Sequence, residues 1–209
     1  MLLQSEKHQK LFATPFFRFH FPEYSQLNAA LLEEGRALRS KEEGVSKSNK
    51  GGWHSEGNLF SNSAAPIKVL NALATDAVVD ATSTIGAKVD PKTLKLKLFA
   101  WMNINPTGGF NAPHTHPGAH WSGVYYVAQP EVEKGDSGMI EFLDPRSDLP
   151  NWRLLDVPSF KIKKKVRPMP GDLILFPSFL MHWVYPNEAE GERVTVAFNA
   201  TFKKVDNSD

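Results

Sequence analysis

Apolar residues recur at helical spacing in two stretches of the first 86 residues. The first stretch, Tyr24–Glu43, places Leu27, Leu31 and Leu38 among charged side chains, which predicts an amphipathic helix. The apolar positions of the second stretch, Ser63–Gly86, are Ile67, Leu70, Leu73, Ala74, Ala77 and Val78. We expect these two helices to pack against the rest of the protein. The segment between them, Glu43–Asn58, is rich in Gly, Ser, Asn and Lys, and predicts a loop.

The period of the pattern changes to two from Leu94 onward. Leu94, Leu96 and Leu98 alternate with Lys95 and Lys97, as expected for a β-strand that continues to Asn105. The other strand candidates are Phe16–Phe21, Trp121–Ala128, Gly138–Leu143, Phe160–Val166, Asp172–Phe176, His182–Tyr185 and Arg193–Phe202. Short strands separated by Pro and Gly turns favour an antiparallel sandwich or barrel over alternating β-α units.

This order of elements predicts a mainly β protein, a double-stranded β-helix (jelly roll) buttressed by N-terminal helices. We expect a single domain over residues 1–209, with helical support and a loop in residues 1–90 and the jelly-roll core in residues 91–203. A chain of 209 residues is long enough for one substantial core.

Composition and charge narrow the functional classes. The 24 basic and 23 acidic residues give a formal charge of +1, so no global field favours nucleic acid or an anionic membrane. Cysteine is absent, which excludes disulfides, thiolate ligands and iron-sulfur clusters, so any metal must take nitrogen or oxygen ligands. The N-terminus, Met1–Lys10, is polar and mixed in charge, and we expect a cytoplasmic protein.

A histidine pair carries the most informative chemistry in the chain. His114 and His116 lie one residue apart in Pro113–Pro117, between two predicted strands, and His182 opens a later strand. Histidines so spaced on an extended segment can turn their ring nitrogens toward one point, and a third from another strand can complete one side of a metal site. The pattern therefore predicts an open mononuclear site held by His114, His116 and His182.

The chain also resembles a known family, the iron(II)- and 2-oxoglutarate-dependent oxygenases, in particular a small group with a Ser-Gly-Val-Tyr-Tyr-Val strand. The matching segments are Trp101–Asn105, Pro113–Pro117, Ser122–Val127, Phe142–Arg146, Pro170–Pro177, His182, Pro186–Asn187 and Arg193–Asn199. They extend in order over residues 94–202, which makes the set far more specific than any one motif.

The resemblance implies a dioxygenase that uses Fe(II), 2-oxoglutarate and O₂, and that couples oxidative decarboxylation of 2-oxoglutarate to hydroxylation of a substrate. It implies that Arg193 holds the distal carboxylate of 2-oxoglutarate and that the Tyr126 phenol donates to a carboxylate. Alternation places Asn199 on the same strand face as Arg193, and the Asn103 amide can orient an oxo acid or a substrate. We expect Arg193, Tyr126, Asn103 and Asn199 to form the co-substrate site.

The third position of the metal motif departs from the family pattern. Most of these oxygenases have a carboxylate there, in a His-x-Asp or His-x-Glu motif, whereas this chain has His116. Three neutral imidazoles would leave the iron with one more positive charge than a carboxylate-containing set. The sequence leaves open whether Asp144, Glu141 or His120 replaces His116 or joins it as a ligand.

Two other functions fit parts of the same pattern. A cupin, a metal-binding isomerase or sugar-binding module of related fold, would use the spacing of Gly108 from His114 and would make His120 a fourth ligand, but it gives Arg193 no role. A jelly roll without catalysis would use the five tryptophans and 14 phenylalanines for its core and an interface. The sequence does not separate a small-molecule substrate from a protein side chain, and it leaves a homodimer open.

Overall fold

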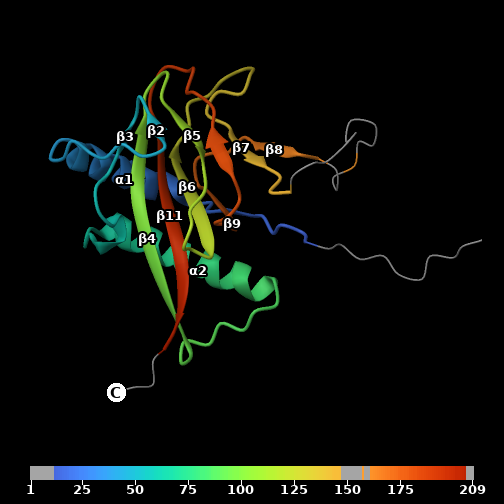
Figure 1. Cartoon of the computed structure of the whole chain (residues 1–209). Coiled ribbons are helices and arrows are strands. Elements are labelled where there is room, and N and C mark those ends of the chain that lie inside the picture. The colour runs from blue at the N-terminus through green and yellow to red at the C-terminus, as the bar shows by residue number, and fades with distance from the viewer. Residues whose placement is uncertain (1–11, 147–156, 158–160, 206–209) are drawn as a thin grey trace, which may run out of the picture.

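The computed structural model describes residues 12–146, 157 and 161–205, and these residues form two antiparallel β-sheets and two α-helices (Figure 1). The mainly β architecture with N-terminal helices, predicted from the sequence, is confirmed. The polar N-terminal segment Met1–Lys10 and the first residue of the predicted strand Phe160–Val166 lie outside the described residues.

The larger sheet has six strands, and its two longest strands, β4 (Leu94–Asn105) and β11 (Arg193–Lys204), lie side by side as the green and red strands of Figure 1. In spatial order its strands are β1 (Phe17–His20), β9 (Asp172–Pro177), β6 (Trp121–Ala128), β11, β4 and β3 (Trp53–His54). β11 pairs with β4 along its whole length, from Arg193 opposite Asn105 to Lys204 opposite Leu94. This register places Arg193 and Thr195 of β11 beside Asn105 and Asn103 of β4.

The smaller sheet has five short strands. In spatial order they are β2 (Asn49–Lys50), β5 (Phe110–His114), β10 (His182–Val184), β7 (Ile140–Leu143) and β8 (Lys163–Val166). β10 lies between β5 and β7, so its first residue, His182, is opposite His114 on one side and Phe142 on the other. The smaller sheet thus aligns two of the three predicted metal ligands.

Two helices cover the outer face of the larger sheet, behind β4 and β11 in Figure 1. They are α1 (Tyr24–Arg39) and α2 (Ala65–Thr84), close to the predicted Tyr24–Glu43 and Ser63–Gly86. α2 is attached to the sheet by a buried hydrogen bond in which the Trp121 indole Nε1–H donates to the Thr82 hydroxyl at 2.9 Å. Among the described residues no helix is long and apolar enough to cross a membrane.

Strict alternation along the strands divides the protein into two apolar cores. The even-numbered residues of β4 and β11 face the helices, and the buried members include Met102, Ile104, Val194, Val196 and Phe198. The opposite faces of β6 and β9 turn toward the smaller sheet, where a second core contains Tyr126, Ile140, Phe142, Val166, Ile174, Phe176, Leu180 and Val184. Because successive strand residues point to opposite faces, the odd-numbered residues of β4 and β11 are left to face the space between the sheets.

Three short strands were not predicted. β2 and β3 contain two residues each and lie within the segment that was expected to be a loop. β5 contains Pro113 and ends at His114, whereas the sequence placed this histidine between strands. None of the three has enough alternating residues to predict a strand, and each exists because it pairs with a longer or better-anchored neighbour.

Candidate metal centre

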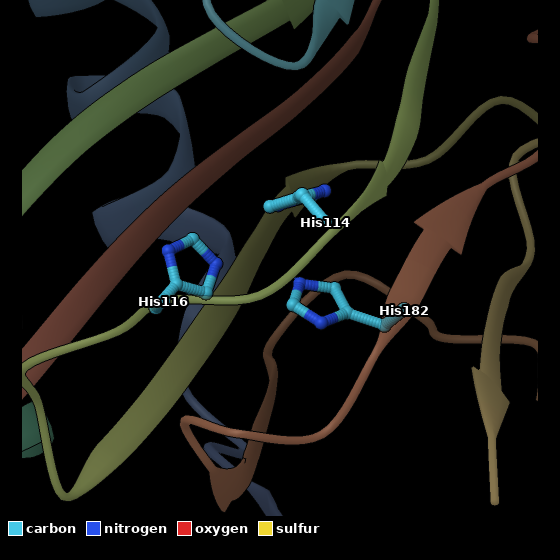
Figure 2. Close-up of side chains that lie close together, drawn as sticks. All are labelled: His114, His116 and His182. Carbon is cyan, nitrogen blue, oxygen red and sulfur yellow. The ribbon is translucent and has the colours of Figure 1, made fainter. Parts of the chain in front are cut away.

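Three histidine side chains converge between the two sheets. His114 and His116 come from β5 and the turn after it, His182 comes from β10, and their rings point toward one another (Figure 2). The ring centroids of His114 and His182 are 4.3 Å apart. The ring centroid of His116 lies 4.9 Å from that of His114 and 5.2 Å from that of His182. The ligand atoms that the three rings offer all lie within 4.8 Å of one another, so they could hold one metal ion.

Strand pairing explains how residues 68 positions apart in the sequence meet. His114 and His182 are direct partners across the β5–β10 ladder, and cross-strand partners on one face are close neighbours. His116 follows β5 and is held by its backbone N–H, which donates to the Ser178 carbonyl at 2.9 Å. Ser178 in turn donates its own backbone N–H to the His120 carbonyl, which closes the turn that carries His116.

Backbone carbonyl groups fix the tautomers of two of these histidines. Nδ1 of His114 lies 2.7 Å from the Ala112 carbonyl oxygen, and Nδ1 of His182 lies 2.8 Å from the Leu180 carbonyl oxygen. A carbonyl oxygen only accepts, so each Nδ1 carries the hydrogen and each neutral ring presents the lone pair of Nε2. This arrangement orients both rings as ligands before any metal arrives.

Burial keeps the three imidazoles neutral. It lowers the pKa of His182 to about 3 and that of His116 to about 4, and the neighbouring His114 contributes to both shifts. Burial also lowers the pKa of His114, although the hydrogen bond to the Ala112 carbonyl acts in the opposite direction. Because a metal binds only the unprotonated ring, these histidines are ready to bind a cation at neutral pH.

A narrow cavity between the sheets joins the histidine cluster to Arg193. Its walls include His114, His116, His182, Asn103, Thr195 and Arg193. The Arg193 side chain is buried, with 2% of its surface exposed, and its Nε–H donates to the Gly138 carbonyl at 3.3 Å. Within the described part of the chain no carboxylate forms an ion pair with it. A buried cation without a carboxylate partner is costly, so this cavity is suited to an anion.

Four side-chain polar atoms are buried without a hydrogen-bond partner among the described residues, namely the Tyr126 hydroxyl, Oδ1 of Asn103, Oδ1 of Asn105 and Oε1 of Gln129. Tyr126 and Asn103 belong to the predicted co-substrate set. The Arg193 guanidinium carbon lies 5.3 Å from the centre of the Tyr126 ring. Burial raises the pKa of the Tyr126 phenol to about 12, so it remains a hydrogen-bond donor at neutral pH, although the charge of Arg193 acts against the shift. Unpaired buried polar groups are uncommon and mark sites where a ligand supplies the missing partner.

The fourth predicted co-substrate residue, Asn199, is placed differently. Its Oδ1 accepts a hydrogen bond from the Ser122 hydroxyl at 2.9 Å, and its side chain does not line the narrow cavity. It lies instead on the wall of a second cavity, together with Trp101, His114 and His116. Arg193 and Asn103 line the narrow cavity and the Tyr126 ring packs against Arg193, whereas Asn199 is on the wall of the other cavity.

The three residues left open as alternative ligands lie outside the histidine cluster. Glu141 accepts hydrogen bonds from the Trp183 indole at 3.2 Å and the Tyr185 hydroxyl at 3.0 Å, and Asp144 accepts from Arg146. Nδ1 of His120 accepts the backbone N–H of Phe202 at 3.2 Å. The four-ligand arrangement that a cupin would require is therefore not assembled around His120.

Sequence reasoning missed two aromatic residues of the second cavity, His54 and Trp101. His54 and Trp101 stack there with ring centroids 5.5 Å apart and an angle of 7° between their planes. Alternation along β4 could have identified Trp101, because it shares a face with Asn103. His54 belongs to β3, whose pairing with β4 places it opposite Asn103, and no local pattern predicts that contact.

A family of proteins described as "Putative 2OG-Fe(II) oxygenase" matches residues 99–199. This range runs from β4 to β11 and contains the three histidines, Arg193, Tyr126 and Asn103. The resemblance to the iron(II)- and 2-oxoglutarate-dependent oxygenases, noted in the sequence, is confirmed. No curated protein matches the sequence.

Several solved structures are similar in fold to most of the chain. A prolyl-4-hydroxylase from Pseudomonas putida is 16% identical with a TM-score of 0.62, and the alignment covers 89% of this chain and 91% of that one. A Trichoplax adhaerens prolyl hydroxylase, solved with a hypoxia inducible factor peptide, is 13% identical with a TM-score of 0.61 and coverage of 89% and 83%. HygX from Streptomyces hygroscopicus, solved with nickel, 2-oxoglutarate and hygromycin B, is 15% identical with a TM-score of 0.56 and coverage of 90% and 83%.

These likenesses confirm the double-stranded β-helix fold that was predicted from the sequence. The predicted cofactors, iron(II) and 2-oxoglutarate, are those of the matching family, and the three histidines could hold the metal. The family match and the fold together support an oxidoreductase-type enzyme, a 2OG-Fe(II) oxygenase.

Proposed function

We propose that this protein is an iron(II)- and 2-oxoglutarate-dependent dioxygenase that hydroxylates an organic substrate, with His114, His116 and His182 as its metal ligands. The single observation that supports it most is the shared cavity. A buried arginine without a carboxylate partner and three neutral imidazoles line the same narrow space between the sheets.

The residues fit an iron(II) ion with a bound oxo acid. Nε2 of His114, Nε2 of His182 and a ring nitrogen of His116 would hold an iron(II) ion and would leave coordination positions open for the oxo acid and for O₂. When bound, the iron and 2-oxoglutarate supply the oxidising chemistry, in which decarboxylation of the oxo acid to succinate accompanies substrate hydroxylation. The contribution of the chain is to fix the ligands, exclude water and orient the two anionic ends of the co-substrate.

Charge balance favours a dianionic co-substrate. Three imidazoles add no negative charge, so the histidine cluster leaves the full charge of a divalent ion, and Arg193 adds a further positive charge in the same cavity. A molecule with two carboxylates neutralises both. We infer that one carboxylate of 2-oxoglutarate approaches the metal and that the other meets the guanidinium of Arg193, which offers paired N–H donors.

Tyr126 and Asn103 complete the inferred co-substrate site. The Tyr126 phenol is protonated and lies beside Arg193, which can donate to its oxygen but cannot accept its hydrogen. A carboxylate there would accept that hydrogen. Asn103 lines the same cavity and has an amide that can donate to an oxygen of the oxo acid. Gly138 supports Arg193 with its carbonyl, and a side chain at this position would collide with Gln129.

An anaerobic titration of iron(II) and 2-oxoglutarate tests the proposal. The visible charge-transfer band of the iron–oxo acid complex should appear in wild type, and Arg193→Met should need about 100-fold more 2-oxoglutarate to produce it, because a buried charge-assisted contact is lost. Arg193→Lys should lie between the two, since it keeps the charge but not the planar fork. Arg39→Met, at a surface ion pair, is the matched control and should equal wild type. Iron binding without this band in wild type would disprove the proposal.

A further inference from the structure

A second cavity, of about 600 Å³, adjoins the histidine cluster, and we call it the outer cavity. Its walls include Lys47, His54, Phe99, Trp101, His114 and His116. It shares the last three of these residues with the narrow cavity that contains Arg193. A volume of this size is within the range of about 300–1,000 Å³ in which proteins bind small molecules. A ligand in the outer cavity would lie beside the histidine cluster. It would not occupy the narrow cavity, which we assign to the oxo acid.

One wall of the outer cavity is a row of aromatic rings. His54 lies parallel to Trp101, Phe99 lies 6.3 Å from Trp101, and Trp101 lies 5.6 Å from His116. Phe99 has 49% of its surface exposed, which is a large apolar area to leave in contact with water. Phe99 belongs to neither apolar core of the described residues. An exposed aromatic surface inside a cavity is best explained by a planar ligand that stacks on it.

The segment that carries His54 is held in place before any ligand binds. The Asn49 amide donates to the Gly52 carbonyl at 3.0 Å, and the backbone N–H of Val45 donates to the His54 carbonyl at 2.9 Å. A Cβ atom on Gly52 would lie 2.3 Å from Oδ1 of Asn105, so only glycine allows this close approach to β4. The aromatic wall is therefore preformed, which reduces the entropic cost of binding.

The charges at the outer cavity favour an anion. No Asp or Glu is among the described residues that line it, and the exposed side chain of Lys47 is at its edge. Nδ1 of His54 lies 2.7 Å from the Ser55 carbonyl, so this nitrogen carries the hydrogen and Nε2 is an acceptor. The wall thus combines a cation, a neutral acceptor and a stack of rings.

We propose that the outer cavity binds the primary substrate and that this substrate is a small molecule with a planar ring and an anionic group, its ring packed against Trp101 and Phe99 and its anion at Lys47. This inference rests on the proposed oxygenase function, because it treats the neighbouring histidines as the metal site. Recognition by stacking and by one charge does not itself depend on iron.

Binding of three probes by isothermal titration calorimetry tests the substrate class. The probes are indole-3-acetate, tryptamine, which has the same ring with a positive charge, and cyclohexaneacetate, which has the same anion without a planar ring. The protein is used both metal-free and loaded with Zn(II) and saturating 2-oxoglutarate, so that the narrow cavity is occupied in one series. Indole-3-acetate should bind at least about tenfold more tightly than either of the others, the factor that corresponds to one good stacking or charge contact.

Variants locate the binding site. Trp101→Leu should weaken indole-3-acetate about tenfold, and Phe99→Leu, which changes a half-exposed ring and leaves folding intact, should weaken it about threefold. Lys47→Gln should weaken it about two- to fivefold, whereas Lys50→Gln, three residues away and outside the cavity, should have no effect. His54→Phe, which keeps the stack, should bind more tightly than His54→Ala.

The outcomes separate this inference from the proposed function. If tryptamine or cyclohexaneacetate binds as well as indole-3-acetate, if none of the three binds, or if Phe99→Leu and Lys47→Gln both leave binding unchanged, the substrate class is wrong even where 2-oxoglutarate binds normally. If indole-3-acetate shows the expected pattern in metal-free protein but 2-oxoglutarate does not bind, the cavity assignment stands and the oxygenase proposal fails.

Discussion

Where the larger sheet adjoins the narrow cavity, both of its faces are buried but they differ in chemistry. On the helix side, the Met102 and Val196 side chains have no exposed surface and belong to the apolar core. On the opposite side, Asn103, Thr195 and Arg193 are 5%, 2% and 2% exposed, yet they are polar or charged. Burial of an apolar group stabilises the fold, whereas burial of an unpaired polar group destabilises it. Consecutive residues of one strand therefore have different roles. Those that face the helices stabilise the fold, and those that face the narrow cavity are available to bind a ligand.

The largest expected effect comes from removing a metal ligand that lies across the narrow cavity from the polar face of the larger sheet. His182→Ala should weaken iron(II) binding by at least about 100-fold and abolish iron-dependent succinate formation, because only two imidazoles remain. Metal analysis after dialysis measures it. His120→Ala is the matched control, since His120 is near in sequence but outside the cluster, and it should retain the metal. Loss of metal in His120→Ala instead would favour the cupin arrangement.

Adjacent residues of β4 offer the sharpest test of the two faces. Met102→Ala should lower the free energy of unfolding by about 2–5 kcal/mol, because it leaves a cavity against the helices, and should leave the affinity for 2-oxoglutarate unchanged in the folded fraction. Asn103→Ala should change stability by less than about 1 kcal/mol, since its Oδ1 has no partner, and should weaken 2-oxoglutarate binding. Chemical denaturation and ligand titration of both variants measure these effects. If Met102→Ala weakened 2-oxoglutarate binding and Asn103→Ala mainly lowered stability, the proposed roles of the two faces would be wrong.

The histidine cluster should also make the stability of the metal-free protein sensitive to acid. The pKa values of His116 and His182 are about 4 and about 3 in the folded protein, below the ordinary 6.5 of an unfolded chain. As the pH falls below 6.5, the unfolded chain therefore binds protons that the folded chain does not. The free energy of unfolding should decrease from pH 6.5 toward pH 4 by on the order of 1 kcal/mol per pH unit for each group.

Urea denaturation in the presence of a chelator measures this dependence, most cleanly between pH 6.5 and 5, above the range in which most carboxylates titrate. His182→Gln should flatten the curve, and His120→Gln should leave it as in wild type. A wild-type stability that does not change between pH 6.5 and 5 would show that the cluster is not held as neutral imidazoles.

The smallest expected effect concerns a single hydroxyl group. Tyr126→Phe keeps the ring against Arg193 but removes the donor, so it should raise the dissociation constant of 2-oxoglutarate by about two- to tenfold. Stability should stay the same or rise slightly, because the removed hydroxyl is buried without a partner. Tyr125→Phe is the matched control on the helix face. Its hydroxyl donates to Asn28 at 2.8 Å, and its loss should reduce stability without affecting the co-substrate.

Long, regular patterns made the main elements of the fold predictable. The period of two along Arg193–Phe202 placed Arg193, Thr195 and Ala197 on one face, and the structure has them on the face opposite the helix-packed core. β5 could not be predicted in the same way, because Phe110–His114 has a proline and no alternation. Its strand conformation comes from pairing with β10, a contact between segments far apart in the sequence.

The candidate site was predictable where a motif defines it and not where the fold alone brings residues together. The spacing of His114 and His116 indicated a ligand pair, the position of His182 at the start of a later strand indicated the third ligand, and the family resemblance added Arg193. The contact of His54 with Trp101 depends on the register of β3 against β4, and the partner of Arg193 is the backbone carbonyl of Gly138. Neither interaction can be predicted from the local sequence.

The most direct test of the central claim is a crystal structure grown without oxygen, with iron(II) and 2-oxoglutarate, in which anomalous scattering locates the iron. We predict iron at about 2.1 Å from one ring nitrogen of each of His114, His116 and His182, with the far carboxylate of 2-oxoglutarate on Arg193. Iron bound by Glu141, Asp144 or His120, or an oxo acid remote from Arg193, would contradict the account.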